Sequence, residues 1–83
     1  MENVIIYTKD NCRYCVMAKN LLDLRGINYY EMVIGKDIMV EDFVQLYPDV
    51  KTAPYILTGN EPIGGFAQLC ERIKNDPVQF LKE

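Results

Sequence analysis

The sequence predicts an α/β domain whose elements follow in the order β-α-β-α-β-β-α. Short runs rich in β-branched and aromatic residues alternate with segments in which apolar residues recur every three or four positions. Glycines and prolines stand where these elements end. The chain has 83 residues, which is enough for one domain. We therefore expect residues 1–83 to form a single domain.

The first half of the chain is predicted to form a βαβ unit. Val4-Ile5-Ile6-Tyr7 is a continuous apolar run, typical of a strand buried on both faces in a parallel sheet. Helix-forming residues follow from Val16 to Arg25 and end at Gly26. Residues favourable for a strand recur from Asn28 to Ile34. Strand, helix and strand in this order form a unit whose crossover is almost always right-handed.

The first helix is expected to bury one apolar stripe and to expose the opposite face. Residues spaced three and four apart define the stripe, which two further apolar residues widen: Cys15, Ala18, Leu21, Leu22 and Arg25, with Met17 and Leu24. The opposite face contains Lys19, Asn20 and Asp23.

A short helix and an antiparallel hairpin are predicted next. Apolar residues at i, i+3, i+4 and i+7 predict an amphipathic helix, namely Val40, Phe43, Val44 and Tyr47. Pro48-Asp49 ends it. A third strand is expected at residues 54–57, followed by a turn at 58–61 and a short return strand at Pro62-Ile63.

The last helix is predicted to begin after Gly64-Gly65. Its apolar face contains Phe66, Leu69, Cys70 and Ile73, which makes Cys70 a core thiol without a catalytic role. Asp76-Pro77 is typical of an N-cap followed by proline and predicts a final helical turn to Leu81.

Composition excludes several classes of function. The formal net charge of −3 argues against a nucleic-acid binder, which is more often basic. No apolar run approaches the roughly 20 residues that span a membrane, and no signal peptide is visible. Three cysteines, an odd number, do not fit a secreted disulfide framework. We expect a cytoplasmic protein that binds neither nucleic acid nor membrane.

The motif Cys12-Arg13-Tyr14-Cys15 stands between a predicted strand and a predicted helix. The first sulfur then lies at the helix N-terminus, where unpaired N–H groups favour a thiolate. Lys9 and Arg13 favour the same state, whereas Asp10 opposes it. Cys15 lies one helical turn further on, close enough to form a disulfide with Cys12. The motif therefore predicts a redox-active pair.

Two other interpretations of the cysteine pair are structural. A zinc site usually needs four cysteine or histidine ligands. The chain has no histidine and only one further cysteine, Cys70, so one monomer cannot complete such a site and no metal site is expected. Alternatively, Cys12 and Cys15 are ordinary buried cysteines.

Three motifs together resemble the small dithiol glutaredoxins. They are Cys12-Arg13-Tyr14-Cys15, Thr52-Ala53-Pro54 about 40 residues later, and Gly64-Gly65-Phe66 about ten residues after that. The resemblance extends over nearly the whole chain. It implies a thioredoxin-like fold, in which a four-stranded mixed sheet carries helices on both faces.

The resemblance implies a glutathione-dependent thiol–disulfide oxidoreductase that reduces protein disulfides and glutathionylated thiols. Cys12 would be the nucleophile and Cys15 the resolving thiol, with glutathione as co-substrate. No tightly bound cofactor is expected. A monomer is expected, and its partners would be disulfide-containing or glutathionylated proteins, with ribonucleotide reductase as a family-level candidate.

The resemblance also places glutathione on this chain. Its glycyl carboxylate would meet two lysines, its cysteinyl backbone would pair with Ala53, and its γ-glutamyl carboxylate would lie at the start of the last helix. Pro54 is expected to follow a cis peptide bond. The binding residues implied are Lys9, Tyr14, Lys51, Thr52, Ala53, Pro54, Gly65, Phe66, Ala67 and Gln68.

Some residues depart from the family pattern. Arg13 replaces the common proline, and Ala53 replaces valine. Ala67-Gln68 replaces a polar and acidic pair that holds the glutathione amino group, so weaker glutathione binding is expected, with the Gln68 amide oxygen as the remaining acceptor. Two alternative functions remain open: a thioredoxin-like electron donor reduced by a flavoprotein reductase, and an iron–sulfur cluster carrier using Cys12 of two monomers and glutathione.

Overall fold

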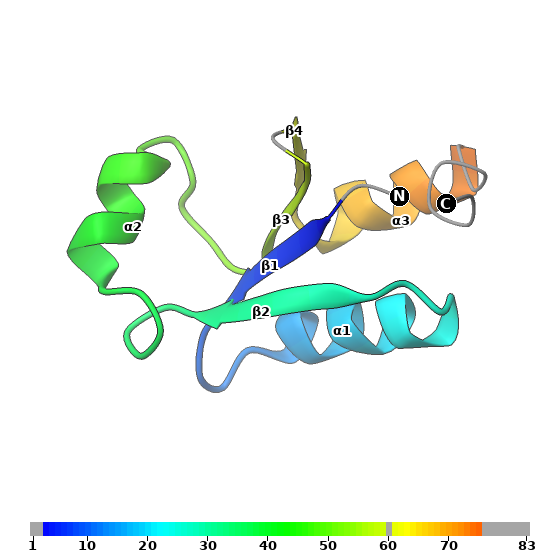
Figure 1. Ribbon diagram of the computed structural model, residues 1–83, viewed down its shortest axis with the longest axis horizontal. Coiled ribbons are helices and arrows are strands. Elements are labelled where there is room, and N and C mark those ends of the chain that lie inside the picture. The colour runs from blue at the N-terminus through cyan, green and yellow to red at the C-terminus, as the bar shows by residue number, and fades with distance from the viewer. Residues whose placement is uncertain (1–2, 60, 76–83) are drawn as a thin grey trace.

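Four strands form one mixed sheet in the order β2-β1-β3-β4 in the computed structural model (Figure 1). The structure describes residues 3–59 and 61–75. The strands are β1 (Val4–Thr8), β2 (Tyr29–Val33), β3 (Tyr55–Thr58) and β4 (Glu61–Gly64). The helices are α1 (Arg13–Leu24), α2 (Val40–Leu46) and α3 (Phe66–Asn75). This confirms the predicted order of elements and the thioredoxin-like fold.

Strand β1 lies inside the sheet and has neighbours of both orientations. It pairs in parallel with β2, with Val4 opposite Tyr29, and antiparallel with β3, with Val4 opposite Thr58. Strand β4 pairs antiparallel with β3. The continuous apolar run of β1 therefore does reflect burial on both faces, but the sheet around it is mixed and not all parallel.

The larger core fills the space between the sheet and the pair α1 and α3. It contains Val4, Ile6, Ala18, Leu22, Ile27, Ile56, Leu69 and Ile73. The apolar stripe of α1 is narrower than predicted, because Met17 is 39% exposed and Leu24 is 84% exposed. Each lies two residues after a buried position, which turns it about 200° around the helix axis.

The opposite face of the sheet carries α2 and a cluster of aromatic rings. The ring centroids of Tyr7 and Phe43 lie 5.0 Å apart, and those of Tyr47 and Tyr55 also lie 5.0 Å apart. Burial and a hydrogen-bonding contact of 3.4 Å between the hydroxyls of Tyr7 and Tyr47 raise the pKa of Tyr7 to about 12. In Figure 1, α2 stands apart on the left, and these rings connect it to the sheet.

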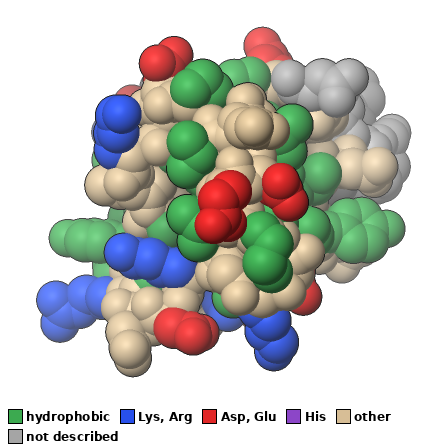
Figure 2. Space-filling model, turned by 90° about the vertical axis from the view of Figure 1, so that its left-hand side faces the viewer, with side chains coloured by type: hydrophobic (Ala, Val, Ile, Leu, Met, Phe, Trp, Pro, Cys, Tyr) green, Lys and Arg blue, Asp and Glu red, His purple; other side chains and the backbone are tan. Residues whose placement is uncertain are grey.

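The predicted apolar face of α2 is only partly buried. Phe43 is buried, but Val40 is half-exposed and Val44 is 51% exposed. Figure 2 shows this side of the molecule, where apolar and acidic side chains are interspersed. The helix has seven residues, about two turns. Its contact with the sheet is therefore made by the Phe43 ring and by Tyr47, which directly follows the helix.

Several boundaries differ from the prediction by one residue. Strand β2 ends at Val33, whose N–H donates to the Asp37 carboxylate at 2.9 Å. Asp37 therefore closes the turn after β2, and the N-cap of α2 is Met39, without a side-chain bond. The predicted helical turn from Pro77 to Leu81 lies outside the described residues. No helix in residues 3–59 and 61–75 has the length and hydropathy needed to cross a membrane.

Candidate active site

Cys12 is the N-cap residue of α1, and Cys15 lies in its first turn. Asn11 precedes them with a positive φ of 55°, which asparagine tolerates better than most residues. The helix begins at Arg13, directly after Cys12, which confirms that the first sulfur lies at the helix N-terminus. The Cys15 N–H points at the Cys12 sulfur at 3.1 Å, so the helix start supplies a donor for a thiolate at Cys12.

The two cysteines form a disulfide, with their Cα atoms 5.2 Å apart. Their surroundings differ, because Cys12 is half-buried whereas Cys15 is only 2% exposed. A partner molecule can therefore reach the Cys12 sulfur but not the Cys15 sulfur. The disulfide confirms the predicted pairing, and the two sulfurs differ in their accessibility to a partner molecule.

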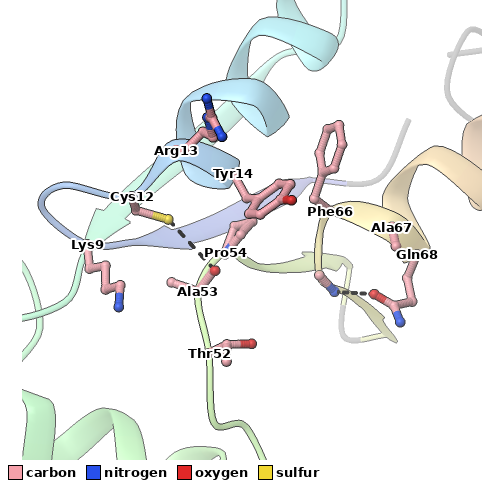
Figure 3. A pocket seen from close by; sticks show the side chains of 11 residues that line it. Lys9, Cys12, Arg13, Tyr14, Thr52, Ala53, Pro54, Phe66, Ala67 and Gln68 are labelled. Atoms are coloured by element: carbon pink, nitrogen blue, oxygen red, sulfur yellow. Dashed lines mark hydrogen bonds between the residues drawn. The ribbon is translucent and has the colours of Figure 1, made fainter.

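The Ala53–Pro54 peptide bond is cis, as predicted. The loop before β3 lies against the cysteine pair, and the Ala53 carbonyl oxygen lies 3.7 Å from the Cys12 sulfur (Figure 3). In the reduced protein a Cys12 thiol can donate to this oxygen, whereas a thiolate cannot. The Ala53 carbonyl thus favours the thiol, and the Cys15 N–H favours the thiolate.

A cavity of about 620 Å³ opens beside Cys12, and we call it the Cys12 cavity (Figure 3). It brings together residues from four segments of the chain: Lys9, Cys12, Arg13, Tyr14, Thr52, Ala53, Pro54, Gly65, Phe66, Ala67 and Gln68. All predicted glutathione-binding residues except Lys51 lie here. Lys51 is exposed and lies outside the lining. Contact of these residues with glutathione remains a prediction.

The Cys12 cavity is positively charged although the whole chain is acidic. Lys9 and Arg13 line it, and its lining contains no aspartate or glutamate, whereas the formal net charge of the chain is −3. Arg13, for which no role in binding is predicted from the sequence, also lines the cavity beside Cys12. A concave site with charges of one sign attracts ligands of the opposite sign.

Two aromatic rings connect α1 to α3 at the cavity. The ring centroids of Tyr14 and Phe66 lie 5.8 Å apart, with a tilt of 36° between the ring planes. Tyr14 is 55% exposed, so its ring is not part of the core. Together the rings give a charged cavity an apolar wall, suited to a ligand with both charged ends and an apolar middle.

At the start of α3, a side chain already occupies one backbone donor. The Gly65 N–H donates to the Gln68 amide oxygen at 2.9 Å, and no acidic residue lies in the first turn of the helix. The Gln68 amide oxygen therefore already accepts one hydrogen bond from the backbone and has one further lone pair for a ligand. A Cβ on Gly65 would lie 3.2 Å from the Gln68 amide oxygen, a tight contact, and 3.6 Å from the Pro54 carbonyl oxygen, an ordinary van der Waals distance.

Cys15 lines a second cavity of about 630 Å³, which we call the Cys15 cavity. Beside it, the Glu31 carboxylate accepts a hydrogen bond from the Thr8 hydroxyl at 2.7 Å and forms an ion pair with Lys19 at 3.0 Å. The Thr8 hydroxyl bond is the main cause of a lowered Glu31 pKa, and Lys19 adds to it. Sequence reasoning placed Lys19 on the solvent face and missed this network, which three separate elements contribute.

Cys70 lines neither the Cys12 cavity nor the Cys15 cavity. It is a free cysteine of intermediate burial and lines another cavity, of about 440 Å³, with Arg25 and Lys74. It is therefore less buried than predicted, because Leu69 and Ile73 provide the buried face of α3. In the described part of the chain, no group of three or more His, Cys, Asp or Glu side chains is placed to hold a metal ion.

Comparisons with known proteins agree with this geometry. The glutaredoxin family model matches residues 4–63. Glutaredoxin 1 of Rickettsia conorii is 31% identical over 85 residues, covering 100% of this chain and 83% of the relative. Glutaredoxin 3 of Escherichia coli K12 is 35% identical over 65 residues, 78% of each chain. The Brucella melitensis glutaredoxin structure superposes with a TM-score of 0.76 at 28% identity, covering 100% of this chain and 94% of the other. The chain therefore belongs to the glutaredoxin family of thiol–disulfide oxidoreductases.

Proposed function

We propose that this glutaredoxin uses glutathione to reduce protein disulfides and glutathionylated thiols. The observation that carries the proposal is the Cys12 cavity, which combines Lys9 and Arg13 with an apolar wall and lacks acidic side chains. Glutathione has two carboxylates and one ammonium group, so its net charge is opposite to that of the cavity. Its cysteinyl sulfur lies between charged ends, as the position of Cys12 requires.

The proposed pose uses the charges at both ends of the cavity. The glycyl carboxylate would meet Lys9, with Arg13 adding to the attraction. The γ-glutamyl carboxylate would lie at the first turn of α3, where backbone N–H groups lack intrahelical partners. The Ala53 backbone would pair with the cysteinyl residue between them. Lys51, which does not line the cavity, has no part in this pose.

Reduction of a glutathionylated thiol needs only Cys12. The Cys12 thiolate attacks the glutathione sulfur, a new sulfur–sulfur bond forms, and the substrate sulfur leaves with the electron pair and takes up a proton. A second glutathione thiolate then attacks the glutathione sulfur bound to Cys12. Glutathione disulfide leaves, and Cys12 returns to the thiolate.

Reduction of a protein disulfide also uses Cys15. Cys12 attacks one substrate sulfur, and the Cys15 sulfur then attacks Cys12 and expels the substrate as a thiolate. The product on the enzyme is the Cys12–Cys15 disulfide that the structure contains. Two glutathione molecules reduce this disulfide and leave as glutathione disulfide, so two electrons pass from glutathione to the substrate.

A thioredoxin-like electron donor is a second candidate, supported by one observation. The lining of the Cys12 cavity contains no carboxylate to pair with the glutathione ammonium group. A glutaredoxin that binds glutathione weakly can depend instead on a flavoprotein reductase.

We also propose a cytoplasmic location, where reduced glutathione is abundant. Cell fractionation tests this location.

The test compares two reducing systems on one protein disulfide. The purified protein receives either glutathione with glutathione reductase, or a thioredoxin reductase, each with NADPH, and Cys12→Ser is the inactive control. Turnover only in the system with glutathione and glutathione reductase supports the main proposal. Turnover only in the system with thioredoxin reductase overturns it. Visible absorbance of the purified protein would instead indicate an iron–sulfur cluster.

A further inference from the structure

The Cys15 cavity is lined by Cys15 and by an ion pair that has no role in the proposed reaction. Lys19, Glu31 and Thr8 line this cavity together with Cys15. None of the three lines the Cys12 cavity. Cys12, Lys9 and Arg13 line both cavities, so the two cavities meet at Cys12, and the network lies on the side of the resolving sulfur.

Helix geometry fixes the position of Lys19 relative to Cys15. The two residues are four apart on α1 (Arg13–Leu24), so their Cβ atoms are neighbours on one helix face, about 5–6 Å apart. The Lys19 ammonium is held by Glu31 at 3.0 Å, and Thr8 holds the same carboxylate oxygen at 2.7 Å. Three elements, α1, β1 and β2, thus hold one cation near one buried sulfur.

The chemistry at Cys15 creates a charge where water is scarce. When glutathione attacks the Cys12 sulfur of the disulfide, a new sulfur–sulfur bond forms and the Cys12–Cys15 bond breaks. The electron pair leaves on the Cys15 sulfur, which is 2% exposed, and a proton from solvent follows. Burying an ion without a partner is costly, so a nearby cation would stabilise this thiolate.

We propose that Lys19 is a positioning residue for Cys15: held by Glu31 and Thr8, it stabilises the Cys15 thiolate whenever this sulfur leaves or attacks. In the forward direction, the Cys15 thiol loses its proton to solvent, and the thiolate attacks Cys12 and expels the substrate sulfur. The inference rests on the dithiol part of the proposed function. Chemistry that uses Cys12 alone depends on the network less.

The other charged groups around the Cys15 cavity are few. Lys9 and Asp10 come from the loop after β1, and Arg13 from the first turn of α1. Glu31 has two opposite effects, because it holds Lys19 in place while its own charge disfavours a thiolate. Removing Lys19 and removing the charge of Glu31 should therefore shift the ionisation of Cys15 in opposite directions.

The test measures the ionisation of Cys15 without any turnover. In a Cys12→Ser, Cys70→Ser background Cys15 is the only thiol, and its thiolate is followed by ultraviolet absorbance against pH. We expect Lys19→Met to raise the ionisation midpoint by about 1 in pH, because the substitution removes a positive charge close to the thiolate. Glu31→Gln, which still accepts from Thr8, should lower the midpoint. Lys19→Arg should restore it.

A matched lysine and a turnover measurement complete the test. Lys36→Met, an exposed lysine that lines neither cavity, should leave the midpoint unchanged. In the otherwise unaltered protein, Lys19→Met should slow reduction of a protein disulfide several-fold more than reduction of a glutathionylated small thiol. Equal midpoints in Lys19→Met and its parent overturn the inference, and so do shifts of one direction in Lys19→Met and Glu31→Gln. Failure of glutathione to support turnover in the unaltered protein would count against the proposed function alone.

Discussion

The side-chain oxygen of Gln68 accepts a hydrogen bond of 2.9 Å from the backbone N–H of Gly65. Gly65 precedes α3 and Gln68 is its third residue, so this contact is one half of a capping box. The same side chain covers Gly64, where an added Cβ would lie 3.0 Å from the Gln68 Cγ. A residue that lines the Cys12 cavity therefore also fixes the turn that forms its wall.

Replacing Gln68 should weaken the start of α3. Gln68→Ala leaves the Gly65 N–H without its acceptor, and we expect a loss of about 0.5–1.5 kcal/mol in the free energy of unfolding. Gln68→Glu, which keeps the acceptor, should retain the stability. Chemical denaturation of the three proteins measures the difference. Equal stability of Gln68→Ala and the parent would show that solvent replaces the cap at no cost.

Adding a carboxylate at position 67 should strengthen glutathione binding. Ala67 is exposed and lines the cavity, whereas the Gln68 amide oxygen already accepts a hydrogen bond from the Gly65 N–H. In Ala67→Asp the new charge can pair with the glutathione ammonium, a gain on the order of 1 kcal/mol in an exposed groove. We expect a several-fold lower KM with little change in kcat, because the contact is remote from the reacting sulfur. A higher KM would mean that the ammonium lies elsewhere.

The two active-site cysteines should have separable roles. Cys12→Ser should abolish all turnover, because the half-buried sulfur at the helix start is the one that substrates reach. Cys15→Ser should keep the reduction of glutathionylated substrates and lose the reduction of protein disulfides. Parallel assays with both substrate types measure this. A dead Cys15→Ser beside an active Cys12→Ser would reverse the assignment.

Stability should fall in alkali through the ionisation of Tyr7. Its pKa is about 12 in the folded protein against an ordinary 10.0, so the unfolded chain loses this proton first. The contribution is complete below pH 10 and is lost as the pH rises through about 12, by about 1.4 kcal/mol per pH unit. Tyr7→Phe should flatten this decline, although burial also raises the pKa of Tyr55. Denaturation midpoints measured from pH 9 to 12 test it, and parallel curves for both proteins would contradict it.

Residue periodicity predicts which elements form but not how much of each helix face is covered. Val44 follows the helical pattern of Phe43 and Tyr47, yet it is half-exposed because a short helix reaches the sheet through its rings alone. Leu24 is apolar, yet it is 84% exposed, because it lies on the opposite side of α1 from the buried stripe. A pattern in one segment carries no information about the surface that it meets.

The site was predictable where the motifs resemble a family and not where contacts join unrelated positions. The residues around Cys12 come from separate motifs that the resemblance connects. The contact of Glu31 with Thr8 and Lys19 depends on the packing of α1 against two strands, and the contact of Gln68 with Gly65 depends on one side-chain rotamer. Neither leaves a periodic signal in the sequence.

The burial of Cys15 makes this protein a suitable reagent for capturing its own substrates. A substrate protein can bond covalently to Cys12, but the enclosed Cys15 sulfur cannot form such an adduct. In Cys15→Ser the adduct on Cys12 has no resolving partner, so it persists until an outside thiol releases it. With Cys70→Ser added to remove the one other cysteine, every captured protein is attached at a single known atom, and its identity can be read directly by mass spectrometry.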